Sequence, residues 1–473
     1  MNRKLLPVLL VFLTIMSGPG LLSAQPDNKE VYRLRREKLL DRMDTGMAIF
    51  KGSSDNFYYL TGYRSPDAAM ALMPGQRHKF VMFLPAAGPL GNIYTGYQYG
   101  PEEAIRLYGA DTAYALSAYD DFVNRHVKRG EVLYADMEND EIQGQLSDMV
   151  RQGRLNGLRS VKNIGNLIQG MRLIKDGYEV QKIRKAVDIT GLSFQKAMAV
   201  TQPGLYEYEV EAAIEYVFRK NGAQQPGFES IVASGSNATI LHYHQNNRRM
   251  EEGKLLLMDI GAEYDFYTAD VTRTIPVNGT FSKEQAELYR LVHQALRKGT
   301  KEMVPGKGIY EAHHRATDII IRGLYQLGLV TDTTSQWQRK FYTLYPIGHW
   351  LGLDVHDVGY YGRNNIHDNR GEMVNKNVRG TILRPGMVVT IEPGIYMRVH
   401  VLDKLKYLFP GVPEEELSAF AQAVKPVYKR YAGIGIRIED DVLITNGGNE
   451  VLSAGIPKNI QSIEKAMQPN DRR

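Results

Sequence analysis

Residues 255–277 read LLLMDIGAEYDFYTADVTRTIPV, two apolar runs on either side of a turn-prone centre. This pattern predicts a β-hairpin. If the hairpin turns at Tyr264 and Asp265, then Asp259 and Asp270 lie directly opposite each other on one face of the sheet. Directly opposed residues have Cβ atoms about 5 Å apart, and two negative charges at about that distance repel by about 3 kcal/mol when the effective dielectric constant is near 20. A cation between the two aspartates would remove this repulsion.

A second interpretation of the hairpin needs no cation: one aspartate belongs to the turn and the other pairs with nearby Arg273. Two glutamates, however, interrupt apolar strand patterns in the same way. Glu392 ends the strand in MVVTIEPG (387–394), and Glu439 lies in the middle of the strand in GIGIRIEDDVLIT (433–445). A single glutamate of this kind is more simply explained as a strand residue facing solvent. Four such carboxylates in one domain favour a metal site.

The segment GHWLGLDVHDVG (348–359) places His349 and His356 seven residues apart in apolar surroundings. Its glycines and the β-branched Val355 and Val358 argue for extended or looped chain rather than a helix. A lone histidine in such surroundings is usually a satisfied core residue, but the four carboxylates need a cation, and a neutral imidazole is a natural fifth ligand. One nitrogen among four carboxylates, with no thiolate, suits manganese, cobalt, iron or zinc, and the four negative charges favour two divalent ions.

The chain has 473 residues, which is too long for one ordinary domain. From Val31 to Ile174, short apolar runs alternate with polar helical stretches, which predicts an N-terminal α/β domain over residues 25–174. The amphipathic segment 177–200 opens a second domain, residues 175–473, which holds nearly all of the unusual acids and histidines. In the first domain we expect strands at 47–52, 80–85, 92–97 and 132–137, and helices at 120–127 and 140–150.

The composition, 43% apolar and 23% charged residues, is that of a soluble globular protein. Because 58 basic residues nearly balance 53 acidic ones and no long basic run occurs, we expect no nucleic-acid partner. Residues 1–24 have a basic start, a short apolar core and small residues at the end, which is typical of a secretory signal peptide. We therefore expect an exported protein, periplasmic or secreted. The alternative, a membrane span, would need about 20 apolar residues, so no stable membrane anchor is expected.

Six segments show a resemblance to a known family. ILHYHQN, LLLMDIGAEYDFYTADVTRT, GHWLGLDVHDVG, TIEPGIY and GIRIEDDVLIT, in this order, strongly resemble the Xaa-Pro aminopeptidases and prolidases, which are pita-bread metallopeptidases of peptidase family M24B. DNFYYLTGY (55–63) resembles a signature of their N-terminal domain. The resemblance implies an α/β (α+β) protein with a creatinase-like α/β domain followed by a pita-bread metallopeptidase domain, whose two αβ halves are related by an approximate two-fold.

The resemblance also implies a metal centre. It holds two divalent ions, for which we expect manganese, with cobalt or zinc as alternatives. Asp270 and Glu439 would each bridge the two ions. Two ions that share one solvent molecule lower its pKa, so that a metal-bridged hydroxide attacks the peptide carbonyl. The implied metal ligands are Asp259, Asp270, His349, Glu392 and Glu439.

Other matched positions imply roles in catalysis and substrate binding. The catalytic residues would be His242 and His356, which contact the scissile carbonyl, and Glu392, which accepts a proton and passes it to the leaving nitrogen. Arg437 would contact a metal ligand, whereas Tyr396 and Arg379 hold positions that lie near the substrate in relatives. Tyr345 stands where relatives often carry another histidine, in LYPIGHW, which puts one polar contact to the leaving group in doubt.

The function that these expectations favour is an exported metallo-aminopeptidase that hydrolyses the first bond of peptides with proline at the second position. The alternative is a prolidase restricted to Xaa-Pro dipeptides. The 46 residues between Glu392 and Glu439 keep it open, because an insertion such as 408–424 could cover the site. A third alternative, a peptide-binding pseudoenzyme, is disfavoured by the five intact ligand positions. The resemblance further implies a homo-oligomer, a dimer or tetramer.

Overall fold

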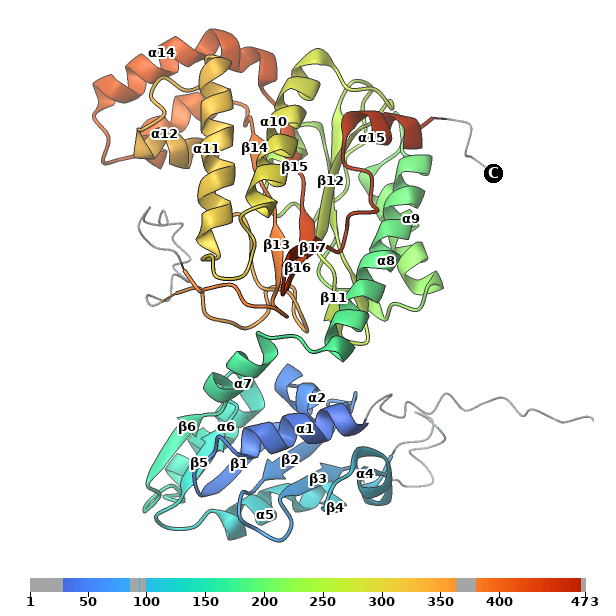
Figure 1. The fold of residues 1–473 in the computed structure, drawn as a ribbon, viewed down its shortest axis with the longest axis vertical. Helices are drawn as coiled ribbons and strands as arrows, with labels where there is room; N and C mark the ends of the chain where they lie inside the picture. Colours follow the sequence, from blue (N-terminus) through green and yellow to red (C-terminus); the bar gives the residue numbers. More distant parts are fainter. Residues whose placement is uncertain (1–28, 86–92, 94–98, 363–379, 469–473) are drawn as a thin grey trace, which may run out of the picture. The chain divides into compact units, whose positions relative to one another are not determined.

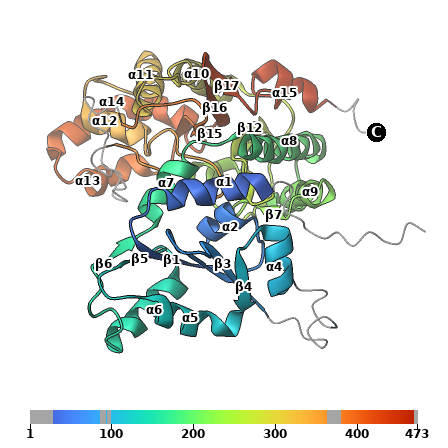
Figure 2. The same ribbon diagram turned by 60° about the horizontal axis from the view of Figure 1, so that its bottom comes forward.

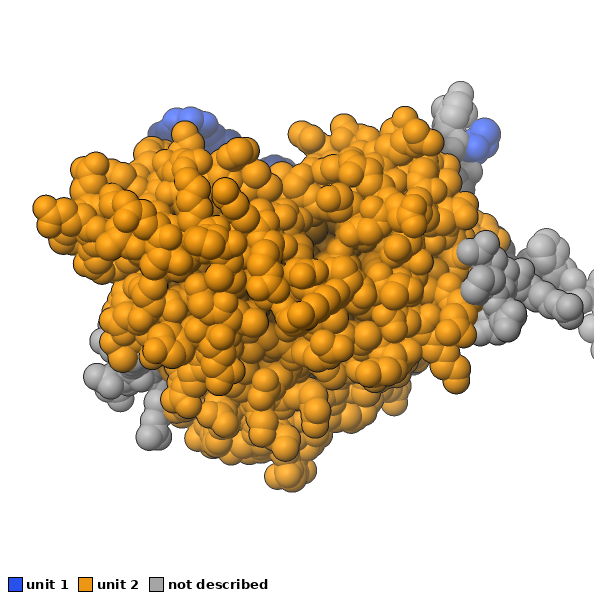
Figure 3. Space-filling view, turned by 90° about the horizontal axis from the view of Figure 1, so that it is seen from above, with its two compact units in different colours: residues 1–167 blue, residues 168–473 orange. Residues whose placement is uncertain are grey.

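The structure is a computed structural model that describes residues 29–85, 93, 99–362 and 380–468. The chain divides into two compact units, residues 1–167 and 168–473, which Figure 3 colours separately. The sequence places the domain boundary at residue 174, whereas the units divide inside helix α7 (Gly165–Arg172). The expected signal peptide, residues 1–24, lies outside the described residues.

The N-terminal unit is built on one mixed β-sheet (Figure 2). Its strands are β1 (Gly46–Lys51), β2 (Ala69–Leu72), β3 (Phe80–Leu84), β4 (Thr112–Ala115), β5 (Val132–Ala135) and β6 (Ser160–Asn163). They lie in the order β4-β3-β2-β1-β5-β6, and β2 runs antiparallel to both of its neighbours. Strands β2, β3 and β5 are buried along their whole length, and β1 is buried in its interior. This burial explains why their sequences are continuous apolar runs.

Helices and a short 3-10 turn complete this unit. They are α1 (Lys29–Leu40), α2 (Asp55–Thr61), α4 (Pro101–Tyr108), η1 (Leu116–Ala118), α5 (Tyr119–His126) and α6 (Asp140–Arg151). Three of the expected strands are confirmed as β1, β3 and β5, and the two expected helices as α5 and α6. The expected strand at 92–97 lies outside the described residues except for Ile93. The sequence patterns missed β4 and β6, whose residues are mostly only half-buried.

The C-terminal unit begins with the expected amphipathic helix and contains two helix pairs. Helix α8 packs against α9, and α10 packs against α11 (Figure 1). The side chain of Asp176 caps the first turn of α8, and Glu179 bonds back to the backbone of Asp176, which explains why that helix begins there. The helices are α8 (Gly177–Val200), α9 (Glu207–Lys220), α10 (Lys283–Thr300), α11 (Tyr310–Gln326), α12 (Gln336–Tyr342), α13 (Leu405–Leu408), α14 (Glu414–Tyr431) and α15 (Ile460–Ala466).

Two sets of strands follow the two helix pairs, so the order of elements repeats once. The first set has strands β7 (Gln225–Pro226), β8 (Ile231–Ser234), β9 (Leu255–Ile260), β10 (Ala262–Tyr264), β11 (Tyr267–Thr268) and β12 (Val271–Pro276). The second has β13 (Val388–Ile391), β14 (Gly394–Tyr396), β15 (Gly435–Arg437), β16 (Asp440–Thr445) and β17 (Gly448–Val451). The first set forms two three-stranded antiparallel sheets, β12-β9-β8 and β11-β10-β7, and the second forms the three-stranded sheet β13-β16-β17 and the two-stranded sheet β14-β15. The two expected αβ halves are therefore present. The 3-10 turns are η2 (Gly235–Thr239) and η3 (Val401–Lys404).

The hairpin of residues 255–277 turns one residue later than expected. Tyr264 pairs with Tyr267, so the turn is formed by Asp265 and Phe266, which both have positive φ, 51° and 66°. Asp259 consequently faces Thr272, and the expectation that it faces Asp270 directly is wrong. A two-residue turn of this kind requires positive φ, which aspartate tolerates. The backbone N–H of Asp265 also donates to the Gln224 side chain at 2.8 Å, a contact that the hairpin sequence does not contain.

Three of the predicted acids lie where a strand leaves one sheet and enters another. Asp270 follows β11 and precedes β12, Glu392 lies between β13 and β14, and Glu439 lies between β15 and β16. The prediction that Glu439 sits inside a continuous strand is therefore wrong. Its backbone N–H donates to the carbonyl of Thr272 on β12 at 3.0 Å, so the two halves meet at this point. This junction brings acids from both halves together.

Each unit has its own apolar core. In the C-terminal unit the core includes residues of α8–α11 and of the sheets β12-β9-β8 and β13-β16-β17. Among the described residues, no helix has both the length and the apolar character needed to span a lipid bilayer.

Candidate metal centre

The predicted site residues surround one cavity of about 330 Å³ in the C-terminal unit. Tyr396 is not part of the lining but hydrogen-bonds to residues that are. Arg379 lies outside the described residues. The lining consists of Leu241, His242, Asp259, Asp270, Tyr310, Tyr345, Pro346, Gly348, His349, His356, Tyr361, Glu392, Arg437 and Glu439.

Three carboxylates on this lining have a buried oxygen that receives no hydrogen bond from any described residue. These atoms are Oδ1 of Asp259, Oδ1 of Asp270 and Oε1 of Glu439. An ionised carboxylate that is buried without a donor is costly, because the interior cannot replace the solvation that it loses. The alternative in which Arg273 neutralises the hairpin acids is excluded, because Arg273 pairs with Asp440 at 2.9 Å. The cavity therefore holds negative charge that protein cations only partly compensate.

The remaining oxygens of these acids are held in place by neighbours. Arg437 pairs with Oδ2 of Asp259, and the hydroxyl of Thr272 donates to Oε2 of Glu439 at 2.7 Å. Arg437 also donates to the Thr272 hydroxyl at 3.1 Å. The orientation of Asp259 and Glu439 is thus fixed while one oxygen of each still faces the cavity. Burial raises the pKa of Asp270 and of Glu439 well above the usual value, and the negative charges of the neighbouring acids add to this rise.

His349 reaches the same point from the loop before β13. Its Nδ1 lies 3.1 Å from the backbone carbonyl of Trp350, so Nδ1 donates there and Nε2 is left as an acceptor. Nε2 lies 3.2 Å from Asp270 and 3.8 Å from Glu392. Gly348 has a φ of 140°, and a Cβ there would lie 2.3 Å from the carbonyl oxygen of Thr390. Only glycine therefore permits the close approach of this loop to β13.

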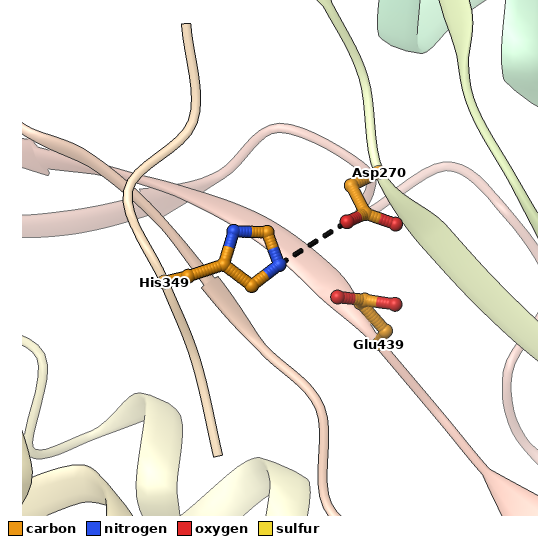
Figure 4. A group of neighbouring side chains, drawn as sticks. All are labelled: Asp270, His349 and Glu439. Carbon is orange, nitrogen blue, oxygen red and sulfur yellow. Dashed lines mark ion pairs between the residues drawn. The ribbon is translucent and has the colours of Figure 1, made fainter. Parts of the chain in front are cut away.

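Asp270, His349 and Glu439 together fit a divalent metal. One potential ligand atom from each lies within 4.8 Å of the others, and Figure 4 shows both carboxylates facing the imidazole ring. Unpaired carboxylate oxygens and an imidazole nitrogen form a donor set that suits manganese, iron, cobalt or zinc. Asp259 and Glu392 line the cavity beside this group and offer further oxygens. The residues present can therefore hold a metal.

Glu392 has the properties of a group that exchanges a proton near neutral pH. Its side chain is 14% exposed. Burial raises the pKa of Glu392 to about 7, although the charges of His349 and Arg437 act in the opposite direction. A general base works best when its pKa lies close to the working pH.

The structure places the two remaining histidines on the cavity wall in different ways. The His356 ring lies 4.3 Å from the His349 ring, centroid to centroid, and nearly perpendicular to it. His242 lies in the loop after η2, next to Tyr243, whose hydroxyl donates to the buried carboxylate of Glu207 at 2.9 Å. Neither histidine belongs to the group that offers ligand atoms within 4.8 Å of one another.

Tyr345 closes one side of the cavity and is bound to other groups of the wall. Its hydroxyl lies 2.7 Å from that of Tyr396 and 3.0 Å from the carbonyl oxygen of Glu392. Tyr396 in turn accepts a hydrogen bond from Arg437 at 3.0 Å. Burial raises the pKa of Tyr345 well above its usual value, so the phenol stays protonated. The site residues Arg437, Tyr396 and Tyr345 therefore form one hydrogen-bonded chain.

Sequence reasoning missed several residues of the site. Thr272 and Asp441 have polar side chains directed towards the metal ligands: the carboxylate of Asp441 accepts from the backbone N–H of Asp270 at 3.1 Å. Asp441 lies two residues after Glu439, in β16, which Glu439 directly precedes, so the alternation of extended chain places both on the same face, and this signal was available. Tyr310 and Tyr361 also line the cavity, but nothing in their local sequence distinguishes them from core tyrosines.

Comparison with known proteins adds two family matches. Residues 181–446 match the model for metallopeptidase family M24, and residues 53–134 match the aminopeptidase P N-terminal domain. The Xaa-Pro aminopeptidase of Haemophilus influenzae is 36% identical over 87% of each chain. Aminopeptidase PepP of Pseudomonas aeruginosa has a similar structure, with a TM-score of 0.80 and 34% identity over 93% of this chain and 98% of its own. Zinc-substituted Escherichia coli aminopeptidase P, solved with a product, has a TM-score of 0.79 and 31% identity over the same shares.

Proposed function

The chain belongs to metallopeptidase family M24, and we propose that it is an Xaa-Pro aminopeptidase, which removes the first residue from peptides that have proline at the second position. One observation carries the proposal. A single cavity joins buried carboxylate oxygens that lack a donor to a histidine nitrogen and to Glu392, whose raised pKa of about 7 suits proton transfer. The names of the relatives supply the substrate class.

Membership of this family makes the chain a hydrolase of peptide bonds. The comparisons also confirm the expected fold, a creatinase-like α/β domain followed by a pita-bread domain, because the two family matches fall in that order. We propose domain limits of 25–174 and 175–473.

We propose that the site takes two divalent ions, with manganese as the native metal. Asp259, Asp270, His349, Glu392 and Glu439 would hold them. When bound, such ions polarise a peptide carbonyl and lower the pKa of water. The unpaired oxygens of Asp259, Asp270 and Glu439 support this assignment, because all three residues line the cavity and these oxygens have no donor among the described residues.

The side chains of the cavity would transfer the protons. Glu392 takes a proton from the attacking water, whose oxygen joins the carbonyl carbon. When the carbon–nitrogen bond breaks, the proton passes to the proline nitrogen, which leaves as a secondary amine. His242 and His356 would contact the carbonyl oxygen, since both line the cavity and neither belongs to the ligand group.

The position of the insertion between Glu392 and Glu439 favours the aminopeptidase over the prolidase. Its longest helix, α14, packs against α10, and Phe420 of α14 packs against Trp337 of α12. No residue from 397 to 434 lines the cavity, and all of these residues are described. An insertion packed in this way does not itself supply the cover that would restrict the site to dipeptides.

The test is a comparison of substrates. Mature protein, residues 25–473, is incubated with manganese and three peptides: an Xaa-Pro-Yaa tripeptide, an Xaa-Pro dipeptide and a control Xaa-Ala-Yaa tripeptide. We expect release of the first residue from the proline tripeptide and slow or no cleavage of the control. Cleavage of the dipeptide alone would identify a prolidase, and metal-loaded protein that binds the tripeptide without cutting it would identify a peptide-binding protein.

We also propose export and self-association. The composition of residues 1–24 supports removal of a signal peptide, and mass spectrometry of the protein from its host should then find a chain that begins near Gln25. An unprocessed N-terminus would contradict this. Light scattering should give the mass of a dimer or tetramer, and a monomeric mass at micromolar concentration would contradict self-association.

A further inference from the structure

A second cluster of buried charges lies next to the cavity and has no part in the proposed chemistry. Asp357, which directly follows His356, accepts a hydrogen bond from Arg172 at 2.6 Å and one from Lys175 at 2.9 Å. All three side chains are 3% exposed or less. Arg172 is the last residue of α7, and Lys175 lies in the short connection before α8. All three belong to the C-terminal unit.

Burying these three charges is unfavourable compared with filling the same volume with apolar side chains. Removing three charges from water costs free energy, and apolar residues of similar size often stabilise a core at least as well. Burial alone would raise the pKa of Asp357, but the charges of Lys175 and Arg172 outweigh it and lower that pKa, so the carboxylate is ionised. Two cations that both bind one carboxylate do, however, fix the position of the backbone that carries it. An apolar contact restricts that position less strictly.

The backbone around Asp357 is held at several points. The N–H of Asp357 donates to the carbonyl of Trp350 at 3.0 Å, and the N–H of Lys175 donates to that of Gly386 at 2.8 Å. A Cβ on Gly352 would lie 2.2 Å from the Asp357 carboxylate, so the loop passes directly over the charge cluster. The hydrogen bond between Trp350 and Asp357 therefore joins the two ends of the segment 350–357. Arg172 and Lys175 fix the end at Asp357, beside His356.

We propose that Arg172, Lys175 and Asp357 form a positioning triad that fixes the backbone at His356 and so sets the place of its imidazole against the His349 ring and the substrate carbonyl. The inference rests on the proposed function, because it assumes that His356 acts in turnover. A displacement of about 1 Å at a group that contacts the reacting atoms can reduce turnover by about 100-fold. The triad residues are positioning residues, since none of them lines the cavity.

The first test replaces Lys175 and measures kcat, KM and bound metal. Lys175→Met removes one cation and leaves the Arg172–Asp357 pair intact. We expect kcat on an Xaa-Pro-Yaa tripeptide to fall by about 10-fold or more, while KM changes by less than about 3-fold and the metal content stays unchanged. Lys175→Arg keeps the charge and should restore kcat to within about 3-fold of the wild type.

The matched control is Lys182→Met. Lys182 also lies near the start of α8 and, like Lys175, does not line the cavity. It makes a largely buried ion pair as well, but its partner is Asp265, at 2.6 Å. We expect its kcat to stay within about 2-fold of the wild type at a comparable loss of thermal stability. Equal kcat values for the Lys175→Met and Lys182→Met variants would overturn the proposal, and so would loss of metal from the Lys175→Met variant.

A double-mutant cycle separates positioning from general weakening. If the triad acts through His356, then Lys175→Met should not reduce kcat further in a His356→Ala background. An additional 10-fold loss in that background would overturn the proposal, because the effect would not pass through His356. If Lys175→Met does not fold, Arg172→Lys, which keeps the charge and loses the planar fork, takes its place in both experiments with the same criteria. A wild-type protein that cleaves no proline peptide would instead refute the proposed function.

Discussion

Glu439 and Asp440 are adjacent in sequence and equally buried, yet the protein satisfies their charges in opposite ways. Asp440 is the first residue of β16 and Glu439 directly precedes it, so the alternation of extended chain turns the two side chains to opposite faces. Asp440 accepts hydrogen bonds from Arg273 at 2.9 Å, Ser453 at 2.7 Å and Lys458 at 2.5 Å. On the cavity side, Glu439 keeps one oxygen without a donor.

The pKa shifts express the same difference. Burial alone would raise the pKa of Asp440, but the charges of Arg273 and Lys458 outweigh it and lower the pKa. For Glu439 burial and the charges of Asp270 and Glu392 act together, and its pKa is raised well above the usual value. The interior of this protein can pair a buried acid with its own cations. Where it does not, as at Glu439, a cation from outside would compensate the charge, and this comparison supports a metal site at the cavity.

The largest expected effect comes from removing a metal ligand. Asp270→Ala deletes a carboxylate that lies within ligand distance of both His349 and Glu439. We expect loss of bound metal and a fall in kcat/KM of about 10⁴-fold or more, which is about 5.5 kcal/mol of transition-state stabilisation. Tripeptide cleavage and elemental analysis of the same sample check this. A variant that loses activity but keeps all of its metal would show that Asp270 is not a ligand.

The next largest effect is a loss of stability on replacing Asp440, which does not line the cavity. Asp440→Asn keeps the shape of the side chain but leaves Arg273 and Lys458 buried without a counter-charge, which should cost about 3–5 kcal/mol of unfolding free energy. Urea denaturation measures this. In metal-free protein, the matched variant Asp270→Asn should have the opposite sign and stabilise by about 1–3 kcal/mol, because it relieves repulsion between acids. If both variants destabilise equally, the two faces do not differ as described.

A smaller effect is expected from the histidine that lies beside the metal ligands. His356→Ala should retain the metal and lower kcat by about 10²-fold to 10³-fold, in the range of a lost proton-transfer or carbonyl-binding group. His349→Ala, its neighbour in the ring contact, should instead lose metal. Equal metal loading in the two variants would refute the division between ligand and non-ligand histidines.

The pH should also change the stability of the metal-free protein. In metal-free protein the pKa of Glu392 is raised from 4.5 to about 7 and that of Asp441 from 3.8 to about 8, so the folded state holds protons that the unfolded state has released. Stability should therefore fall as pH rises from about 4.5 to about 8, with Glu392 contributing about 3 kcal/mol. Saturating manganese should reverse the slope, because ions bind the deprotonated acids. Thermal midpoints at pH 5 to 8, with chelator or with manganese, measure both slopes. A metal-free midpoint that rises with pH would contradict this account.

The sequence led to the candidate metal ligands because charged residues inside apolar strand patterns are rare enough to stand out. Asp259, Asp270, Glu392 and Glu439 were found in this way, and the cavity contains all four. The turn was predicted one residue too early, which moved the partner of Asp259 by two residues, because the turn at Asp265 depends on contacts from outside the hairpin. The sequence patterns do not reveal the contact between Arg172 and Asp357, because it joins residues 185 positions apart.

If the acids of the cavity need an external cation, metal-free protein should bind manganese at this site. Calorimetric titration of metal-free protein with manganese at pH 7, repeated in buffers of different ionisation enthalpy, counts both the ions bound and the protons released. We predict two ions per chain and release of at least about one proton, because acids with raised pKa values must ionise to bind metal. Folded protein that binds no manganese, or that binds it without releasing protons, would contradict the account.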